Sequence, residues 1–227
     1  MEIKMIKIAI DGPSGSGKST LAKALAKTMG YVYVDTGALY RSIALYMLES
    51  GVDIADNKAV VGALCNVSLE MKHDEGGTQH VFLNGEDVGG RIRTSEVSAA
   101  ASKVSAIPEV RAFLLDTQRN MAKVTNVIMD GRDIGTVIFP DAEVKIFLTA
   151  GNRARAERRY KELIEKGEDI TLEKVLADME SRDVNDRTRK EAPAVPAEDA
   201  VFLDNSGFSA EETVNAALKI IKEKIEI

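Results

Sequence analysis

A phosphate-binding sequence near the N-terminus is the clearest chemical signal in the chain. Gly12 is followed, after four residues, by Gly17, Lys18 and Ser19, directly after the apolar run Ile6–Ile10 and before a helical pattern. Glycines let successive backbone N–H groups turn toward phosphate oxygens, and the N-terminus of the following helix attracts the same anion. In this pattern the lysine reaches the β- and γ-phosphates and the serine hydroxyl ligates Mg²⁺. The motif predicts that the chain binds a nucleoside triphosphate.

Charged and polar residues follow two later apolar runs. Thr36 and Arg41 come after the second run, at the start of a predicted helix. Asp130 comes after the third run, where phosphate-loop enzymes place a carboxylate that holds Mg²⁺ or its water shell. Arg132 and Asp133 come next, in a glycine-flanked turn. We expect them to face the same cleft; the alternative is a mutual surface ion pair, which contributes little to stability.

Arginines are concentrated in the second half of the chain. Of thirteen arginines, seven lie within the 37 residues from position 153 to 189. Two groups have the spacing of one helical face: Arg155, Arg158 and Arg159, then Arg182, Asp186 and Arg189. Like charges three and four residues apart destabilise a helix unless acidic neighbours or an anionic ligand offset the repulsion. Either a solvated charged helix or a helix that binds a small polyanion accounts for the first group.

If the chain transfers a phosphoryl group from the triphosphate, the arginines suit an acceptor that is itself a phosphate. Such an acceptor needs no deprotonation near neutral pH, only positive groups that let two anions approach, and an arginine at the transition state contributes ~10³ to 10⁵ in rate. An alcohol acceptor would need a base, and the two histidines, His73 and His80, lie elsewhere, in a predicted insertion. Four arginines on different predicted elements are candidates for a second phosphate clamp: Arg41, Arg132, Arg182 and Arg189.

Alternating strands and helices must position these residues. Short, nearly continuous apolar runs are typical of strands buried on both faces, and they occur at Ile6–Ile10, Tyr31–Val34, Val127–Met129, Val144–Leu148 and Ala200–Leu203. Helical patterns occur at Ser19–Met29, Ala38–Leu48, Pro108–Ala122 and Asn152–Lys166, with a last helix that presents Val214, Leu218, Ile221 and Ile225 on one face. This order predicts an α/β fold with a doubly wound, five-stranded parallel sheet and ligands at the carboxyl ends of the strands.

One segment departs from this order. Between Val67 and Val88 the sequence alternates as strands do, and Asn84-Gly85 is a strong signal for a hairpin turn. We predict a small antiparallel insertion here; an irregular surface loop is the alternative.

Composition limits the class of protein. With 227 residues, of which 44% are hydrophobic, the chain is long enough for one sizeable core and short for two. The net charge of −6 and the absence of tryptophan disfavour a nucleic-acid partner. We find no signal-peptide pattern and no apolar run near the ~18 residues of a membrane span, so we expect a cytoplasmic protein. The single cysteine, Cys65, cannot form an internal disulfide, and we interpret it as a small buried hydrophobe.

At these residues the chain resembles the bacterial cytidylate kinases, within the nucleoside monophosphate kinases of the P-loop class. The resemblance runs from Ile8 to about Leu203. It rests on IDGPSGSGKST, VDTGALYR, the run from Glu96 to Arg111, DGRDIGTVIFPDAEVKIFL, RAERR and the tail from Arg182 to Asp204. It implies one kinase domain over residues 1–227, with a monophosphate-binding arm at about 36–106 that carries the small sheet, and an arginine-rich lid at about 153–169.

The resemblance also implies roles for individual residues. ATP would be bound by Gly12, Pro13, Ser14, Gly15, Ser16, Gly17, Lys18, Ser19 and Thr20, with Arg155 and Arg159 from the lid. CMP would be bound by Thr36, Ser102, Arg111 and Asp133 at the base, Asp186 at the ribose, and Arg41, Arg132 and Arg189 at the phosphate. Catalysis would depend on Lys18, Arg132, Arg158 and Arg182. Mg²⁺ would be held by Ser19, with Asp130 acting through water.

The sequence thus predicts a monomeric enzyme of pyrimidine metabolism that transfers the γ-phosphoryl of MgATP to CMP or dCMP, with no nucleic-acid or membrane partner. The first alternative is a kinase for another small acceptor, such as UMP, AMP or shikimate. A nucleotide-dependent switch is the second, but the Asn-Lys-x-Asp motif that reads guanine does not occur in the sequence. The third, a nucleic-acid-binding ATPase, conflicts with the acidity and with the lack of an aromatic-basic stretch.

Overall fold

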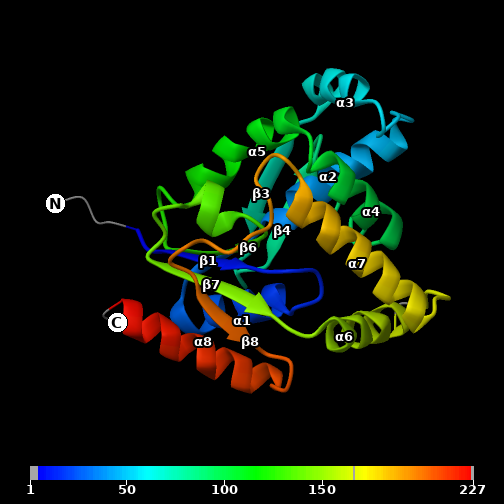
Figure 1. Cartoon of the computed structure of the whole chain (residues 1–227). Coiled ribbons are helices and arrows are strands. Elements are labelled where there is room, and N and C mark those ends of the chain that lie inside the picture. Colours follow the sequence, from blue (N-terminus) through cyan, green and yellow to red (C-terminus); the bar gives the residue numbers. More distant parts are fainter. Residues whose placement is uncertain (1–4, 166, 226–227) are drawn as a thin grey trace.

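The computed structural model describes residues 5–165 and 167–225, and within them a five-stranded parallel sheet lies at the centre (Figure 1). The strand order is β2-β6-β1-β7-β8. The strands are β1 (Lys7–Asp11), β2 (Val32–Asp35), β6 (Val127–Gly131), β7 (Val144–Thr149) and β8 (Val201–Asp204). The predicted five-stranded parallel sheet is therefore confirmed.

Each strand of this sheet ends one or two residues later than its apolar run. The added residues are mostly polar: Asp11, Asp35, Asp130 with Gly131, Thr149 and Asp204. They still pair with their neighbours, as Asp35 does with Asp130 on the adjacent strand. Strand pairing uses backbone groups, so a hydrophobic pattern misses a polar residue at a strand end. These polar ends all lie at the carboxyl edge of the sheet.

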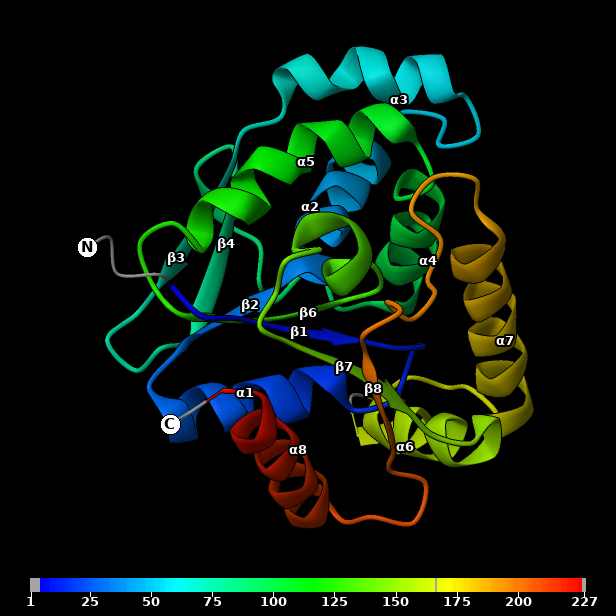
Figure 2. The ribbon, with the colours of Figure 1, turned by 60° about the vertical axis from the view of Figure 1, so that its left-hand side comes forward.

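Helices cover both faces of the sheet (Figure 2). They are α1 (Lys18–Met29), α2 (Thr36–Glu49), α3 (Asn57–Ala63), α4 (Ser95–Val104), α5 (Pro108–Met121), α6 (Asn152–Glu165), α7 (Leu172–Thr188) and α8 (Ala210–Lys224), with short turns η1 (Leu64–Asn66) and η2 (Ile134–Ile138). Helices α1 and α8 pack on one face, where Leu25 and Ile221 are fully buried. On the opposite face, η2 and the end of α5 cover Met129. The predicted doubly wound arrangement is confirmed.

The predicted antiparallel insertion is also present. Strands β3 (Leu69–His73), β4 (Gln79–Leu83) and β5 (Glu86–Asp87) form a separate three-stranded sheet. Asn84 and Gly85 join the last two with φ values of 50° and 87°, as a two-residue hairpin requires. This sheet packs with α2, α3, α4 and α5 around their own buried cluster.

Helices α6 and α7 form a small unit beyond the carboxyl edge of the sheet (Figures 1 and 2). They bury Ala156, Leu163, Val175 and Met179 between them. The helix predicted at Asn152–Lys166 is observed to Glu165, and Lys166 lies outside the described residues.

One prediction about the surface is wrong. Cys65 is exposed, because it lies in η1 after α3, where its thiol donates to the Gly62 carbonyl. No helix in residues 5–165 and 167–225 is long and apolar enough to cross a membrane.

Candidate active site

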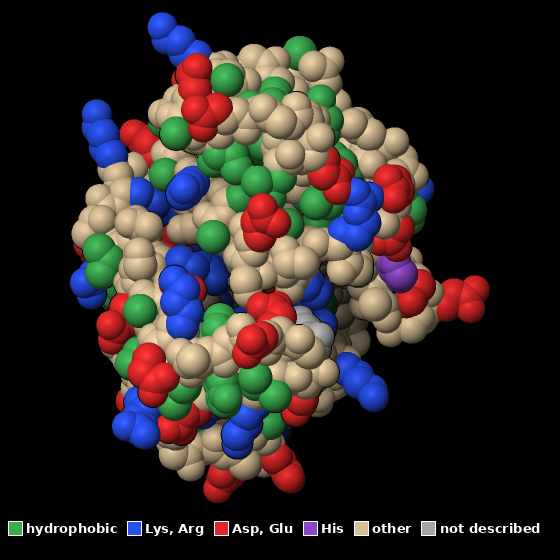
Figure 3. All heavy atoms as spheres, turned by 90° about the vertical axis from the view of Figure 1, so that its right-hand side faces the viewer, with side chains coloured by type: hydrophobic (Ala, Val, Ile, Leu, Met, Phe, Trp, Pro, Cys, Tyr) green, Lys and Arg blue, Asp and Glu red, His purple; other side chains and the backbone are tan. Residues whose placement is uncertain are grey.

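A cleft of about 650 Å³ lies at the carboxyl edge of the central sheet. Figure 3 shows the molecule hollowed near the middle of this side, with Lys and Arg side chains gathered there. Most predicted site residues line it: Ser14, Gly15, Gly17, Lys18, Ser19, Thr20, Thr36, Arg41, Ser102, Arg111, Asp130, Arg132, Asp133, Arg158, Arg159, Arg182, Asp186 and Arg189. Four do not: Gly12, Pro13, Ser16 and Arg155.

The loop between β1 and α1 has the conformation of a phosphate cradle. Gly12, with φ 149°, lies so close to β7 that a Cβ atom on it would be 2.0 Å from the Leu148 carbonyl oxygen. Gly15 and Gly17 have φ values of 70° and 90°, which disfavour any residue with a side chain. The Lys18 Nζ donates to the Pro13 carbonyl at 2.7 Å across this loop.

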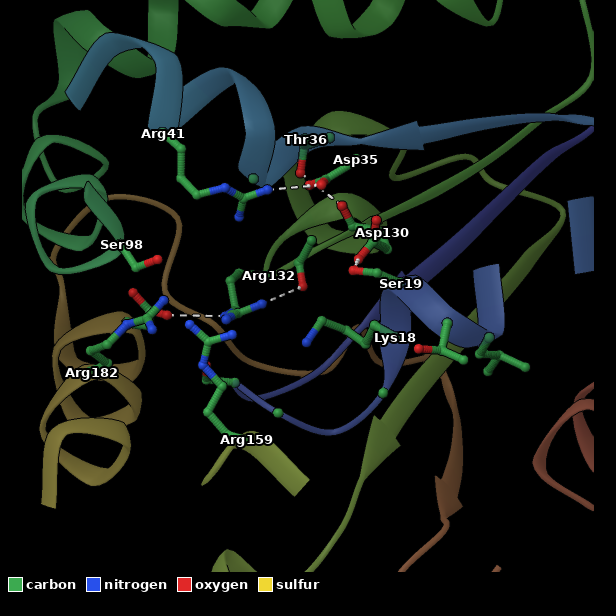
Figure 4. A pocket seen from close by; sticks show the side chains of 18 of the residues that line it. Lys18, Ser19, Asp35, Thr36, Arg41, Ser98, Asp130, Arg132, Arg159 and Arg182 are labelled. Atoms are coloured by element: carbon green, nitrogen blue, oxygen red, sulfur yellow. Dashed lines mark hydrogen bonds and ion pairs between the residues drawn. The ribbon is translucent and has the colours of Figure 1, made fainter. Parts of the chain in front are cut away.

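Ser19 and Asp130 meet at the floor of the cleft (Figure 4). The Ser19 hydroxyl donates to Asp130 Oδ2 at 2.7 Å. Burial, followed by the nearby Asp35 carboxylate, raises the pKa of Asp130. A hydroxyl and a carboxylate are oxygen ligands of the kind that Mg²⁺ binds, so this pair suits a divalent cation that also contacts phosphate.

Arg155 lies behind the phosphate loop and not in the cleft. It is 4% exposed, and its Nη1 donates to the Ser14 carbonyl at 2.6 Å and to Asp183 at 2.5 Å. Asp183 also accepts from the Ser14 N–H at 3.0 Å. These contacts hold Arg155 against the loop, and they connect α6 and α7 to it.

The other two arginines of α6 face the cleft. Arg158 donates to the side chain and carbonyl of Asn205 at 3.2 and 2.9 Å, and Asn205 in turn donates to the Ser16 carbonyl. Arg159 pairs with Glu162 at 3.1 Å. Asn205 and Asp183 were not among the predicted residues, because single polar side chains after a strand and within a charged helix carry no distinctive sequence signal.

Arginines from three elements point into one space between α2 and α7 (Figure 4). Arg41 pairs with Asp35 at 2.8 Å, and Arg132 pairs with Asp186 at 3.0 Å. Among the described residues, Arg182 makes no hydrogen bond or ion pair, and its buried Nε is unsatisfied. Burial, and then the nearby Arg132, lowers the pKa of Arg182 to about 10. This space therefore has positive charge without enough anions to balance it.

A buried network closes the end of the cleft next to α4 and α5. Arg111 pairs with Asp133, which lies 3.5 Å from Arg189. Arg132 and Asp133 therefore do not form the mutual surface pair that the sequence allowed. Ser102 and Thr36 also line this end. Carboxylate, guanidinium and hydroxyl groups together can bind a polar heterocycle through several hydrogen bonds.

Apolar residues also line the cleft, among them Phe208, Ala210 and Val214. Phe208 lies near Arg158, because its N–H and the Arg158 guanidinium both donate to the Asn205 carbonyl. Phe208 is 43% exposed, and a flat ring beside guanidinium groups is suited to a nucleotide base. The sequence predicted Val214 only as a core position, and the apolar cluster of α8 does include it.

Comparisons with known proteins decide the family. The family profile described as cytidylate kinase matches residues 8–223. The cytidylate kinase of Flavobacterium johnsoniae is 45% identical over 99% of this chain and 100% of that protein, and that of Caldicellulosiruptor bescii is 46% identical over 98% and 100%. The chain belongs to the cytidylate kinase family. The family assignment confirms the resemblance found in the sequence.

A solved structure shares the fold of this cytidylate kinase family member at low identity. An uncharacterized protein from Eubacterium ventriosum is 12% identical, with a TM-score of 0.53, over 96% of this chain and 99% of that one. Kinases of this kind use ATP with a divalent metal. In residues 5–165 and 167–225, no group of three or more His, Cys, Asp and Glu side chains could hold a metal alone. The donor set fits an ion held largely by nucleotide phosphates and water, as Mg²⁺ commonly is.

Proposed function

We propose that this chain transfers the γ-phosphoryl group of MgATP to CMP or dCMP, which gives ADP and CDP or dCDP. The observation that carries the proposal is the unpaired Arg182 beside Arg132 and Arg159, in the same cleft as the phosphate loop. Positive charge without a partner is expensive to bury, and two phosphate groups brought together at this point would balance it. Family membership supports the same reaction.

On the donor side, the phosphate loop binds the triphosphate. Backbone N–H groups of the loop surround the phosphates, apart from Pro13, which has none, and Ser14, whose N–H donates to Asp183. The Lys18 ammonium leaves the Pro13 carbonyl to reach the β- and γ-phosphates. Ser19 would hold Mg²⁺, with Asp130 acting through water, and the ion would neutralise phosphate charge. Phe208 and Val214 contact the base, which adds residues that the sequence did not predict.

On the acceptor side, charged residues bind the nucleotide at three points. Arg41, Arg132 and Arg189 bind the monophosphate, while Asp186 binds a ribose hydroxyl. Four residues bind the cytosine: Thr36, Ser102, Arg111 and Asp133. Cytosine has an amine donor beside carbonyl and ring-nitrogen acceptors, so a carboxylate, a guanidinium and hydroxyls can pair with all of them. A base that leaves such buried groups unpaired is strongly rejected.

In the transfer step, the acceptor phosphate attacks the γ-phosphorus in line, the bond to the β-phosphate oxygen breaks, and ADP leaves. Lys18, Arg132, Arg158 and Arg182 stabilise the charge on the equatorial oxygens. We assign Arg155 a supporting part, because it binds the loop carbonyl of Ser14 and not the cleft.

We propose that two parts of the chain move during the reaction, because each has its own buried cluster. The unit with the small sheet, at about residues 36–106, serves as the monophosphate-binding arm, and the segment at about 153–169 serves as the lid. Both belong to one kinase domain over residues 1–227. Closure of the lid excludes water, so that the nucleotide receives the phosphoryl group.

The proposed reaction also limits the setting. We infer a cytoplasmic enzyme, because both of its proposed substrates are nucleotides of the cytoplasm. One chain supplies every residue in the proposed site, so a monomer is sufficient. The proposed substrates are mononucleotides, and we propose no nucleic-acid partner.

Product analysis tests the proposal. Purified protein is incubated with MgATP and CMP, and nucleotides are separated by chromatography; we expect equal amounts of CDP and ADP. Lys18→Ala, purified in the same way, should form neither at a comparable rate, which controls for contaminating kinases. Formation of ADP without CDP, or near-normal turnover by Lys18→Ala, contradicts the proposal.

A further inference from the structure

Asp130 is held at both of its carboxylate oxygens. Its Oδ2 accepts from the Ser19 hydroxyl at 2.7 Å, and its Oδ1 accepts from the Tyr33 hydroxyl at 3.0 Å. Tyr33 lies on β2, the neighbour of the strand that carries Asp130, and only Val34 separates it from Asp35, the register partner of Asp130. The carboxylate is therefore fixed from two directions, by one residue in the cleft and one outside it.

Tyr33 does not belong to the substrate cleft. It is 5% exposed and is absent from the cleft lining. Its ring packs in the cluster beneath α1, and the Lys23 ammonium lies 5.6 Å from its centroid. Its hydroxyl donates to Asp130 and also lies within reach of the Ser19 hydroxyl. A buried phenol needs a hydrogen-bond partner, and here that partner is the carboxylate of the proposed metal site.

The contact limits where Asp130 can turn. Lys18 and Arg132 are both close enough to act on Asp130 electrostatically. Without the Tyr33 hydroxyl, the carboxylate would be free to rotate toward either cation and away from Ser19. Groups behind a metal-binding side chain commonly fix its orientation, and their loss reduces metal affinity by 10- to 100-fold.

We propose that Tyr33 is a positioning residue for the divalent cation of the nucleotide site, and that it acts through Asp130. This inference rests on the proposed function, because it requires that the site bind a metal–triphosphate complex. It adds a residue of β2 that the sequence marked only as part of an apolar strand.

Tyr33→Phe tests the inference, since it keeps the ring and removes the hydroxyl. The affinity of a fluorescent ATP analogue is measured with and without Mg²⁺, and the ratio gives the tightening due to the metal. We expect Tyr33→Phe to reduce that ratio about tenfold, while the metal-free affinity stays close to wild type. Tyr31→Phe is the matched control, because Tyr31 is a partly buried tyrosine of the adjoining segment that does not bond to Asp130.

A double-mutant cycle separates positioning from a general structural effect. In an Asp130→Asn background, Tyr33→Phe should cause little further loss of the metal-dependent tightening. The inference is overturned if Tyr33→Phe lowers the nucleotide affinity equally with and without Mg²⁺. It is also overturned if Tyr33→Phe reduces the metal-dependent tightening as much in the Asp130→Asn background as in wild type. Failure of the proposed function is distinguishable, because wild type itself would then show no tightening by Mg²⁺ and no formation of CDP.

Discussion

At the residue scale, the site is built from charges that the ligand-free protein accommodates poorly. Lys18 is 6% exposed, and burial, followed by the nearby Arg132, lowers its pKa to about 7. Bound phosphates favour the charged ammonium. Nucleotide binding should therefore restore the proton that burial removes.

This gives a pH-dependent prediction. The Lys18 pKa is low in the free protein and higher in the complex, so MgATP binding takes up a proton above about pH 7, and affinity falls as pH rises through that range. Calorimetry at pH 8 in buffers with different ionisation enthalpies should report uptake approaching one proton. Lys18→Arg keeps its charge at this pH and should show almost none. Equal uptake by both proteins would contradict the assignment to Lys18.

Arg182 gives a second prediction, because it is partly buried without a partner. Arg182→Met should raise the unfolding free energy of the ligand-free protein by about 1 kcal/mol and lower kcat by at least ~10³. Arg155→Met is the contrasting variant. It leaves Asp183 without its buried partner, so it should lower the unfolding free energy by about 3 kcal/mol. Urea denaturation and a coupled ADP assay measure both. Similar destabilisation by the two changes would show that Arg182 has a structural partner.

At the element scale, the phosphate loop has its shape because it runs against β7. Gly12→Ala would place a Cβ atom 2.0 Å from the Leu148 carbonyl oxygen at a φ of 149°. We expect it to abolish nucleotide binding and to lower the melting temperature by several degrees. Gly62→Ala is the matched control, because nothing lies within 4 Å of its Cβ position and it should stabilise α3 by about 0.5–1 kcal/mol. Normal nucleotide affinity in Gly12→Ala would contradict this account of the loop.

The elements also show what a sequence can and cannot predict. Periodicity and apolar runs predicted the central sheet, the helices on its faces and the hairpin at Asn84-Gly85, because these follow from local patterns. The same patterns ended each strand too early, since the polar residues at the strand ends pair through their backbones. They also could not find Asp183, Asn205 and Tyr33, whose contacts join segments far apart in the chain.

The arginines of α6 show the same limit. Spacing placed Arg155, Arg158 and Arg159 on one helical face as one group. In the folded chain, Arg155 is buried against the phosphate loop, whereas the other two line the cleft. Helical spacing gives the face of a residue but not the depth at which the neighbouring segments bury it.

At the scale of the whole molecule, the cleft lies where three buried clusters meet. The central sheet supplies the phosphate loop, the unit with the small sheet supplies Arg41, and the adjoining α5 supplies Arg111. The α6–α7 unit supplies Arg158 and Arg182. Because each unit has its own core, relative movement need not disturb packing within any of them. We expect each nucleotide to draw a different unit toward the sheet, so MgATP without an acceptor should give little ADP.

The most direct test of this account is ADP release with MgATP alone and with CMP, dCMP, UMP, AMP or shikimate. We predict little ADP without an acceptor and strong stimulation by CMP and dCMP, well above that by the other three. ADP release without an acceptor would contradict the exclusion of water from the cleft. Equal stimulation by AMP or shikimate would contradict its selectivity for cytosine.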